Sequence, residues 1–267
     1  MKIYIYIILP ILVFSLLSCE KELNFKYHNV EPQLVIEGVL SQEEARVCLS
    51  NTTPMNEKIE NDYLTDAVVY LRDKSSSQIE ILHPNRDGIY TSKFDPSIGD
   101  EYELIVERNG KVYSSSCMMR PATRILGLLF QWIKMPYDYV AVLQIIFMDF
   151  ESIDDCYWIK IYRNDEPYKW IISDDRSAVT GVITEVIMTT RKDLKEEDEK
   201  DILEDGDEVR VVINTISREM YDYLTAIENN SNGQTMFEGE FCLGYFMASD
   251  SVSDTIIFHP EKITQYE

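Results

Sequence analysis

The chain has 267 residues, of which 45% are hydrophobic and 11% aromatic, and its formal net charge is −22. This composition is typical of a globular protein with enough chain to bury a sizeable core. The strong negative charge repels phosphate backbones and anionic membrane surfaces, so the sequence argues against nucleic acid as a partner.

Residues 1–18 have the features of a secretory signal peptide. Lys2 supplies a positive start, and an almost wholly apolar run extends from Ile3 to Leu17. The run is shorter than the roughly 20 residues of a membrane-spanning helix. No basic stop-transfer flank follows it. We therefore expect a cleaved leader rather than a membrane span.

The leader ends in Leu16-Leu17-Ser18-Cys19, which resembles the bacterial lipobox. The resemblance implies that Cys19 becomes the first mature residue, carries a diacylglycerol on its thiol, and carries a further acyl chain such as palmitate on its amine. Two or three chains suffice for stable anchoring, because each buried CH₂ contributes about 0.8 kcal/mol. The alternative is an ordinary secretory signal with a chance cysteine. On the first interpretation, residues 19–32 are a lipidated tether.

Residues 33–121 are predicted to form a β-sandwich of immunoglobulin or transthyretin type. Turn residues separate most of the short strand-like runs, as an antiparallel sandwich requires. Asn109-Gly110 is the strongest hairpin signal, because both residues tolerate the positive φ of a type I′ turn. The runs are 33–40, 45–49, 67–72, 78–82, 88–94, 101–106 and 111–117.

Residues 122–267 are predicted to form a second β-rich domain. Its first two runs, 125–133 and 139–150, are strongly apolar, but each is too short to span a membrane and we interpret them as buried strands. The later runs are 156–162, 168–172, 182–190, 208–214, 241–248 and 255–258.

One amphipathic helix is predicted in this second domain, over residues 217–229. Met220, Tyr223, Leu224 and Ile227 have the spacing of one helical face. Ser217 is suited to cap the amino end of the helix. We expect the helix to lie across an edge or a face of the second sheet.

The sequence contains no recognisable catalytic or metal-binding motif. The acidic run between Arg191 and Asp207 fails as a calcium loop, because Leu203 and Val212 would occupy ligand positions. No nucleophile elbow, phosphate-binding loop or dinucleotide fingerprint is present. The adjacent carboxylates Asp154-Asp155 and Asp174-Asp175 should point to opposite faces of a strand. We expect a protein that is not an enzyme and has no metal or cofactor.

Two features of the sequence leave alternatives open. The four cysteines beyond Cys19 permit two disulfides, but three lie in apolar runs, which favours buried free thiols. Aromatic residues crowd one third of the chain and could form a binding surface, although the core of the second domain is the interpretation that we favour. The cysteines are Cys48, Cys117, Cys156 and Cys242, and the aromatic residues are Trp132, Tyr137, Tyr139, Tyr157, Trp158, Tyr162, Tyr168 and Trp170.

Several short motifs follow the lipobox in a fixed order, and they are Leu34–Gly38, Gly88–Tyr90, Tyr102–Leu104, Gly110–Ser114, Gly206–Val209, Ile216–Tyr223 and Gly244–Phe246. This order resembles the domain of unknown function 4249 family of lipoproteins. The resemblance implies an outer-membrane lipoprotein. Members are often encoded beside TonB-dependent receptors, which implies work with such a receptor, and no catalytic residues carry over. The segment Met236–Glu240 departs from the glycine- and asparagine-rich approach to Gly244 that is usual in the family.

These observations predict a non-enzymatic accessory lipoprotein that works with a TonB-dependent outer-membrane receptor in uptake or binding. The alternative is a stand-alone ligand-binding or adhesive protein of the cell surface, and a hydrolase of an unfamiliar type is a third class. Glu20 and Glu22, directly after Cys19, resemble a surface-export signal, although a merely hydrophilic tether has the same composition. The surface-facing side of the outer membrane is therefore slightly favoured over the periplasmic side.

Overall fold

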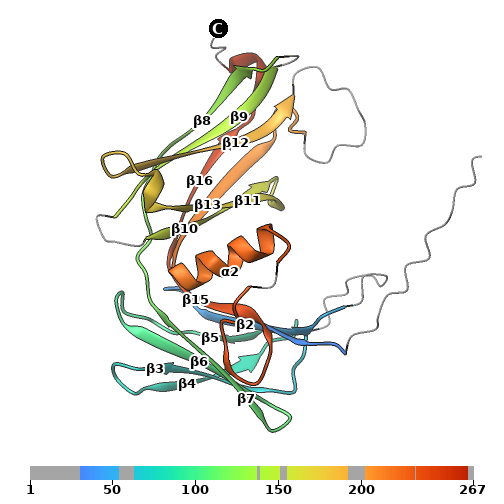
Figure 1. Cartoon of the computed structure of the whole chain (residues 1–267), viewed down its shortest axis with the longest axis vertical. Coiled ribbons are helices and arrows are strands. Elements are labelled where there is room, and N and C mark those ends of the chain that lie inside the picture. The colour runs from blue at the N-terminus through green and yellow to red at the C-terminus, as the bar shows by residue number, and fades with distance from the viewer. Residues whose placement is uncertain are drawn as a thin grey trace, which may run out of the picture. The chain divides into compact units, whose positions relative to one another are not determined.

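The computed structural model describes residues 31–53, 63–136, 139–150, 155–191, 202–231 and 233–263 (Figure 1). The described chain is mainly β, with strands β1 to β16 and one α-helix, α2. The prediction of a mainly β fold with a single amphipathic helix is therefore confirmed. No helix in the described part combines the length and the apolar character needed to cross a membrane.

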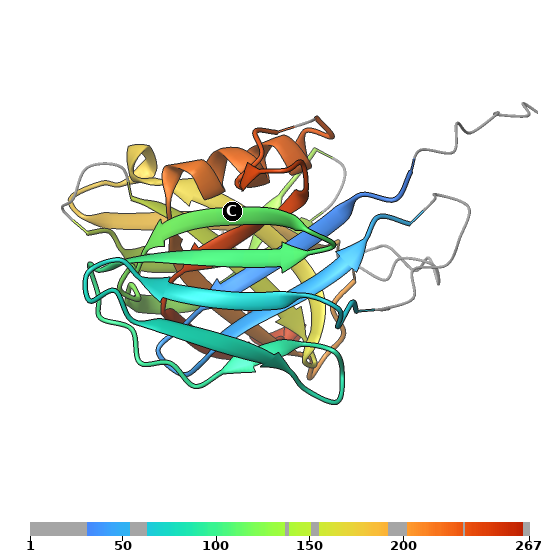
Figure 2. The ribbon, with the colours of Figure 1, turned by 90° about the horizontal axis from the view of Figure 1, so that it is seen from below.

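The first sandwich is a nine-stranded sheet that folds over onto itself (Figure 2). Its strand order is β14-β7-β6-β3-β4-β5-β2-β1-β15. The first part of β4 pairs with β3, and its last residues pair with β5, so β4 carries the sheet from one layer to the other. The first seven strands are β1 (Leu34–Leu40), β2 (Ala45–Asn51), β3 (Val68–Asp73), β4 (Ile79–Pro84), β5 (Tyr90–Ser92), β6 (Glu101–Arg108) and β7 (Lys111–Met118).

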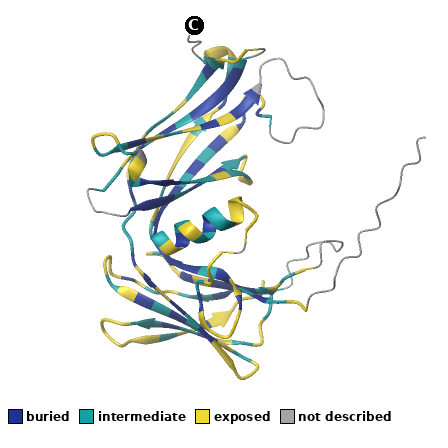
Figure 3. Cartoon of the chain, viewed as in Figure 1, coloured by how far each residue is buried: buried dark blue, intermediate teal, exposed yellow. Residues whose placement is uncertain are grey.

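Alternating side chains fill the space between these layers. In β6, Tyr102, Leu104 and Val106 are buried, whereas Glu101 and Glu107 are exposed, as the period of two along a strand requires (Figure 3). The β6–β7 hairpin turns at Asn109 and Gly110, whose φ values of 53° and 74° are both positive. The predicted type I′ turn is confirmed.

The second sandwich consists of two sheets that share one apolar core. One sheet has the order β12-β9-β8 and the other β11-β10-β13-β16. This arrangement is the Greek-key order of an immunoglobulin-like sandwich with its fourth strand in the second sheet, as in fibronectin type III domains. The strands are β8 (Ile125–Lys134), β9 (Tyr139–Met148), β10 (Cys156–Arg163), β11 (Glu166–Asp174), β12 (Val182–Arg191), β13 (Glu208–Ile216) and β16 (Ser251–Ile257).

Between β13 and β16 the chain leaves the second sandwich and forms α2 (Arg218–Glu228), β14 (Glu238–Gly239) and β15 (Leu243–Ala248). The Ser217 side chain accepts a hydrogen bond from the Met220 amide and caps α2, so the predicted helix and its cap are confirmed. Met220 and Leu224 are the buried residues of the helix. They pack in a small core with Cys156, Ile216 and Met247.

The predicted division at residues 121/122 is wrong for the segment that contains β14 and β15. β14 pairs with β7, and β15 pairs in parallel with β1, so both strands belong to the first sandwich. The sequence shows that residues 241–248 can form a strand. It does not show which sheet they join, because strand pairing depends on tertiary contacts.

Two glycines allow this segment to approach the first sheet. A Cβ on Gly239 would lie 2.3 Å from the Val112 carbonyl oxygen, and a Cβ on Gly244 would lie 1.9 Å from that of Ile36. Their φ values of 94° and 107° are also unfavourable for any other residue. Glycine is therefore required at both positions for the backbone contact.

We predict that Gly244→Ala destabilises the protein by more than about 3 kcal/mol, because the methyl group overlaps the backbone of β1 and the φ angle is strained. Urea unfolding of wild type and variant measures the change. Gly127→Ala is the matched control, since a Cβ added there would meet no atom within 4 Å. A Gly244→Ala protein as stable as the control would contradict the close approach.

Candidate functional site

The predicted lipid-attachment residue, Cys19, lies outside the described residues. The same is true of the signal peptide 1–18 and of nearly all of the tether 19–32. These assignments stay predictions, and the candidate site in the described part of the chain is a different feature.

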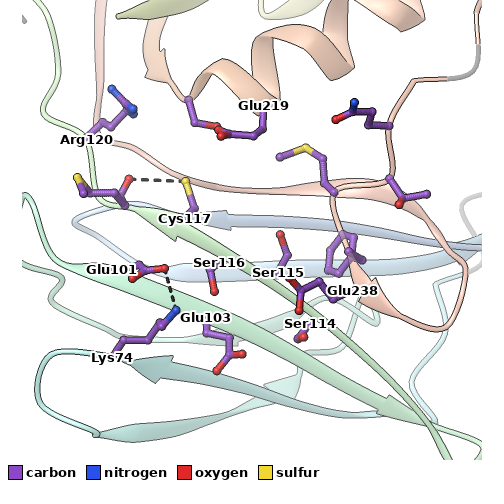
Figure 4. Close-up of a pocket in the computed structure, with 16 residues that line it drawn as sticks. Lys74, Glu101, Glu103, Ser114, Ser115, Ser116, Cys117, Arg120, Glu219 and Glu238 are labelled. Atoms are coloured by element: carbon purple, nitrogen blue, oxygen red, sulfur yellow. Dashed lines mark hydrogen bonds and ion pairs between the residues drawn. The ribbon is translucent and has the colours of Figure 1, made fainter. Parts of the chain in front are cut away.

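A groove of about 530 Å³ lies beside β7 in the first sandwich (Figure 4). The stretch Ser114–Met118 of β7 forms one side of the groove, and Gln234–Glu238, which leads into β14, forms the other. Ser217 and Glu219 contribute from the start of α2. Successive side chains of a strand point to opposite faces, so a groove lined by five consecutive residues runs along the edge of the strand.

The backbone of β7 has an open stretch at this edge. Val112 accepts a hydrogen bond from the Glu240 amide, and Arg120 donates its amide hydrogen to Ala248, so even-numbered residues direct their backbone groups away from β6. β14 covers Tyr113 and Ser114 alone. Within the described residues, no backbone partner is found for Ser116 or for the Met118 amide; the Met118 carbonyl accepts only the Cys117 thiol, at 3.6 Å.

The opposite wall is anchored in the first core. Phe237 is only 6% exposed and belongs to the buried cluster between the layers, and Met236 packs against the same cluster. Glu238 pairs with Ser114, and the chain before it diverges from β7. The groove is therefore a gap between β7 and the segment that precedes β14, and it closes where β14 pairs with β7.

The groove has an excess of negative charge. Lys74 forms an ion pair with Glu101 at 2.8 Å, and Arg120 forms one with Asp155 at 3.1 Å. Both cations of the lining are therefore already neutralised by carboxylates. Glu219 and Glu238 also line the groove, and no ion-pair partner for either is found in the described part of the chain. The site therefore favours a ligand group that is positively charged.

The carboxylate pairs of the sequence do not form an acid–base pair in the structure. Asp174 binds Arg176 and Arg218, and Asp155 binds Arg120, while Asp154 lies outside the described residues. Burial alone would raise the pKa of Asp174, but the two arginines outweigh it and lower that pKa. No group of three or more potential metal ligands is found among the described residues.

The four cysteines Cys48, Cys117, Cys156 and Cys242 are all buried, and none forms a disulfide in the structure. This confirms the interpretation that we favoured from the sequence. Burial raises the pKa of the Cys156 and Cys242 thiols to about 12. They therefore stay protonated at neutral pH and are poor nucleophiles.

The aromatic residues noted in the sequence lie in two places. Some pack in the core of the second sandwich, and others lie near α2 and β15. Trp132 and Tyr157 belong to the core of the second sandwich, and Tyr139 and Tyr168 pack against it, as we favoured. Trp158 instead contacts Tyr245 of β15 edge to face, with ring centroids 5.9 Å apart. Trp170 is 36% exposed, and Tyr137 lies outside the described residues. These side chains do not form the groove.

A second feature that the sequence did not predict is the desolvated Lys160. Its amine lies 4.4 Å from the centroid of the Trp158 ring, a cation–π contact. The residue as a whole is half-buried, but desolvation of its amine lowers the pKa of Lys160 to about 8. A lysine in an alternating strand pattern is ordinarily expected to face solvent, so nothing in the sequence distinguished this position.

Comparison with known proteins identifies the family. Residues 20–253 match the family described as Domain of unknown function (DUF4249). The chain belongs to the DUF4249 family. No curated protein matches the sequence.

Two solved structures are similar to this DUF4249 protein at low levels. The first is described as a two fibronectin type-III domain segment from chicken tenascin, with 10% identity, coverage of 85% of this chain and 99% of the other, and a TM-score of 0.27. The second is described as a cytokine receptor complex, with 8% identity, coverage of 70% and 86%, and a TM-score of 0.27. The strand order of the second sandwich, and not these similarities, identifies its immunoglobulin-like fold.

The groove of this DUF4249 protein was not predictable from the sequence. The one local signal was the departure of Met236–Glu240 from the family pattern, and most of that segment forms the groove wall and β14. Serines such as those at positions 114–116 are common in half-exposed strands, so they did not indicate a binding site. The open edge depends on how far β14 extends, which is a tertiary feature.

We predict that Lys160→Met stabilises the protein at pH 7 by about 1–3 kcal/mol, because it removes a charge that is costly to bury. The folded-state pKa lies below the unfolded value of about 10.4, so the unfolded chain binds more protons between these values. The penalty is complete below about pH 8 and fades as the pH rises. The advantage of the variant should therefore be smaller at pH 10, as measured by urea unfolding at both pH values.

Lys111→Met is the control for this experiment, since Lys111 is exposed and forms a surface pair with Glu240 at 3.5 Å. Its effect should stay below about 0.5 kcal/mol at both pH values. An equal advantage of Lys160→Met at pH 7 and pH 10 would show that the Lys160 amine is not desolvated.

Proposed function

We propose that this DUF4249 protein is a lipid-anchored accessory protein of the outer membrane that binds a partner and works with a TonB-dependent receptor in uptake or binding. The observation that carries the proposal is the sequence Leu16-Leu17-Ser18-Cys19 directly before residue 20, where the family match begins. The acyl chains on Cys19 supply the membrane attachment, and the folded body supplies recognition.

The structure of the body supports a binding role. Its two sandwiches are linked by a chain segment that starts in the second and completes the first, and a recessed polar groove lies beside that segment. The carboxylates Asp155 and Asp174 are engaged by arginines, which suits a structural role better than proton transfer. A rigid scaffold that carries a preformed groove is suited to recognition.

The alternative is a stand-alone ligand-binding or adhesive lipoprotein of the cell surface. The groove supports this alternative as much as it supports the accessory role. Its lining does not specify whether the bound ligand belongs to a membrane receptor. Binding of purified glycans or host proteins by the acylated chain, with no receptor present, would favour the alternative.

We predict that affinity purification of the native chain in mild detergent recovers a β-barrel receptor of the outer membrane. Cys19→Ala should release the protein from membranes, because no acyl chain remains, and should reduce receptor recovery by about tenfold or more. Cys48→Ala, a change of the same type at a buried cysteine, is the control and should stay membrane-bound. Membrane retention of Cys19→Ala, or the absence of any receptor from the native purification, would contradict the proposal.

A further inference from the structure

We propose that the groove beside β7 binds an extended peptide segment of a partner protein, which adds a strand to the open edge of β7 and places a lysine or arginine between Glu219 and Glu238. This inference concerns the groove alone and does not require that the partner be a receptor. It therefore goes beyond the proposed function.

The edge of β7 carries open backbone groups that can pair with another strand. The amide and carbonyl of Ser116 and the amide of Met118 face the groove without a backbone partner in the described part of the chain. Unpaired groups at a sheet edge are a template for another strand, and peptide recognition by strand addition uses such an edge. A ligand that adds a strand would satisfy all of these groups at once.

The open stretch of β7 is short and is closed at both ends. β14 covers β7 up to Ser114, and the Arg120 amide donates to Ala248, so other parts of the chain occupy both ends. At about 3.3 Å per residue, the interval from Ser114 to Arg120 is about 20 Å long. β15 approaches β7 toward the Arg120 end, where the Ala248 amide donates to the Cys117 thiol at 3.4 Å. The interval therefore suits only a short extended segment centred on Ser116, because a longer strand would collide with β14 or β15.

The lining of the groove carries carboxylates that favour a basic residue of the ligand. Ser114–Met118 lines one side of the groove and Gln234–Glu238 lines the other, and Figure 4 shows Ser114, Ser115 and Ser116 along β7 with Glu238 near Ser114. An extended backbone paired with the edge of β7 would direct alternate side chains to the two faces of the sheet. Glu219 lies on the α2 side and Glu238 on the β14 wall, and charge complementarity selects a basic residue there.

A phage-displayed library of random 12-residue peptides, selected on the detergent-solubilised full-length chain, tests the proposal. We expect enrichment of peptides that combine a short alternating pattern with lysine or arginine. Hydrogen exchange followed by mass spectrometry should show protection of residues 114–120 when a synthetic enriched peptide is added. Failure to enrich any sequence, or binding without protection of this segment, would overturn the proposal.

Backbone variants make the test specific. Ser116→Pro removes the outward amide and should weaken peptide binding by about tenfold or more in fluorescence anisotropy. Ser116→Ala keeps the amide and should bind as wild type does. Equal affinity of both variants would overturn strand addition. Circular dichroism of each variant checks that the fold is retained.

Charge variants keep the proposal testable if Ser116→Pro does not fold. Glu219→Gln and Glu238→Gln should each weaken binding of a basic peptide by about threefold, because each removes one carboxylate from the lining. Glu240→Gln is the matched control, since Glu240 pairs with Lys111 and does not line the groove. An equal effect of all three changes would overturn the placement of the basic residue.

The occupant could also be supplied by the chain itself, through residues 20–31. Deletion of this segment would then increase hydrogen exchange at residues 114–120 of the peptide-free protein, and that outcome would overturn a partner peptide as the ligand. Affinity purification of the Ser116→Pro variant separates the two proposals. If the receptor still co-purifies with this variant, the accessory function stands. The binding of peptides to the groove is then tested by the peptide experiments alone.

Discussion

The return of residues 238–248 to the first sheet is the interaction on which the rest of the structure depends. This segment is inserted between two strands of the second sandwich, yet it supplies both outermost strands of the nine-stranded sheet, β14 beside β7 and β15 beside β1. The first core includes side chains from this segment and the residue before it, namely Phe237, Cys242 and Phe246. The approach is close enough that Gly244 has no room for a side chain. Folding of the first sandwich is therefore coupled to that of the second.

The same segment decides which edges of the sheet stay open. An exposed strand edge promotes aggregation, and proteins usually cover it. β15 runs along most of β1, whereas β14 covers only two residues of β7, and the chain then turns away to contact the first core. The remaining open edge of β7 is recessed between this segment and the start of α2. A recessed edge can accept one short strand but is poorly accessible to another folded copy, which suits a specific binding site.

The contact between the sandwiches contains buried polar groups that reduce the stability of the folded protein. Arg120, at the end of the first sandwich, pairs with the 3%-exposed Asp155 at the start of the second, and its Nε is buried without a hydrogen-bond partner in the described residues. Within the second sandwich, Lys160 is likewise partly desolvated, against Trp158 of the same strand. Such groups reduce stability relative to apolar residues of the same size, and the apolar contacts of Met220, Leu224 and Met247 offset them.

The sequence by itself determined the features that depend on local chemistry. These are the alternating strands, the turn at Asn109-Gly110, the capped helix that begins after Ser217, and the resemblance to the DUF4249 family. The lipidated Cys19 is also a prediction of local sequence. Only the tertiary structure decided that residues 238–248 join the first sheet, that β7 keeps an open edge, and that Lys160 is desolvated. A strand pattern specifies which side chains face inward, but its pairing partner and the burial of its outer face are set by segments far away in the chain.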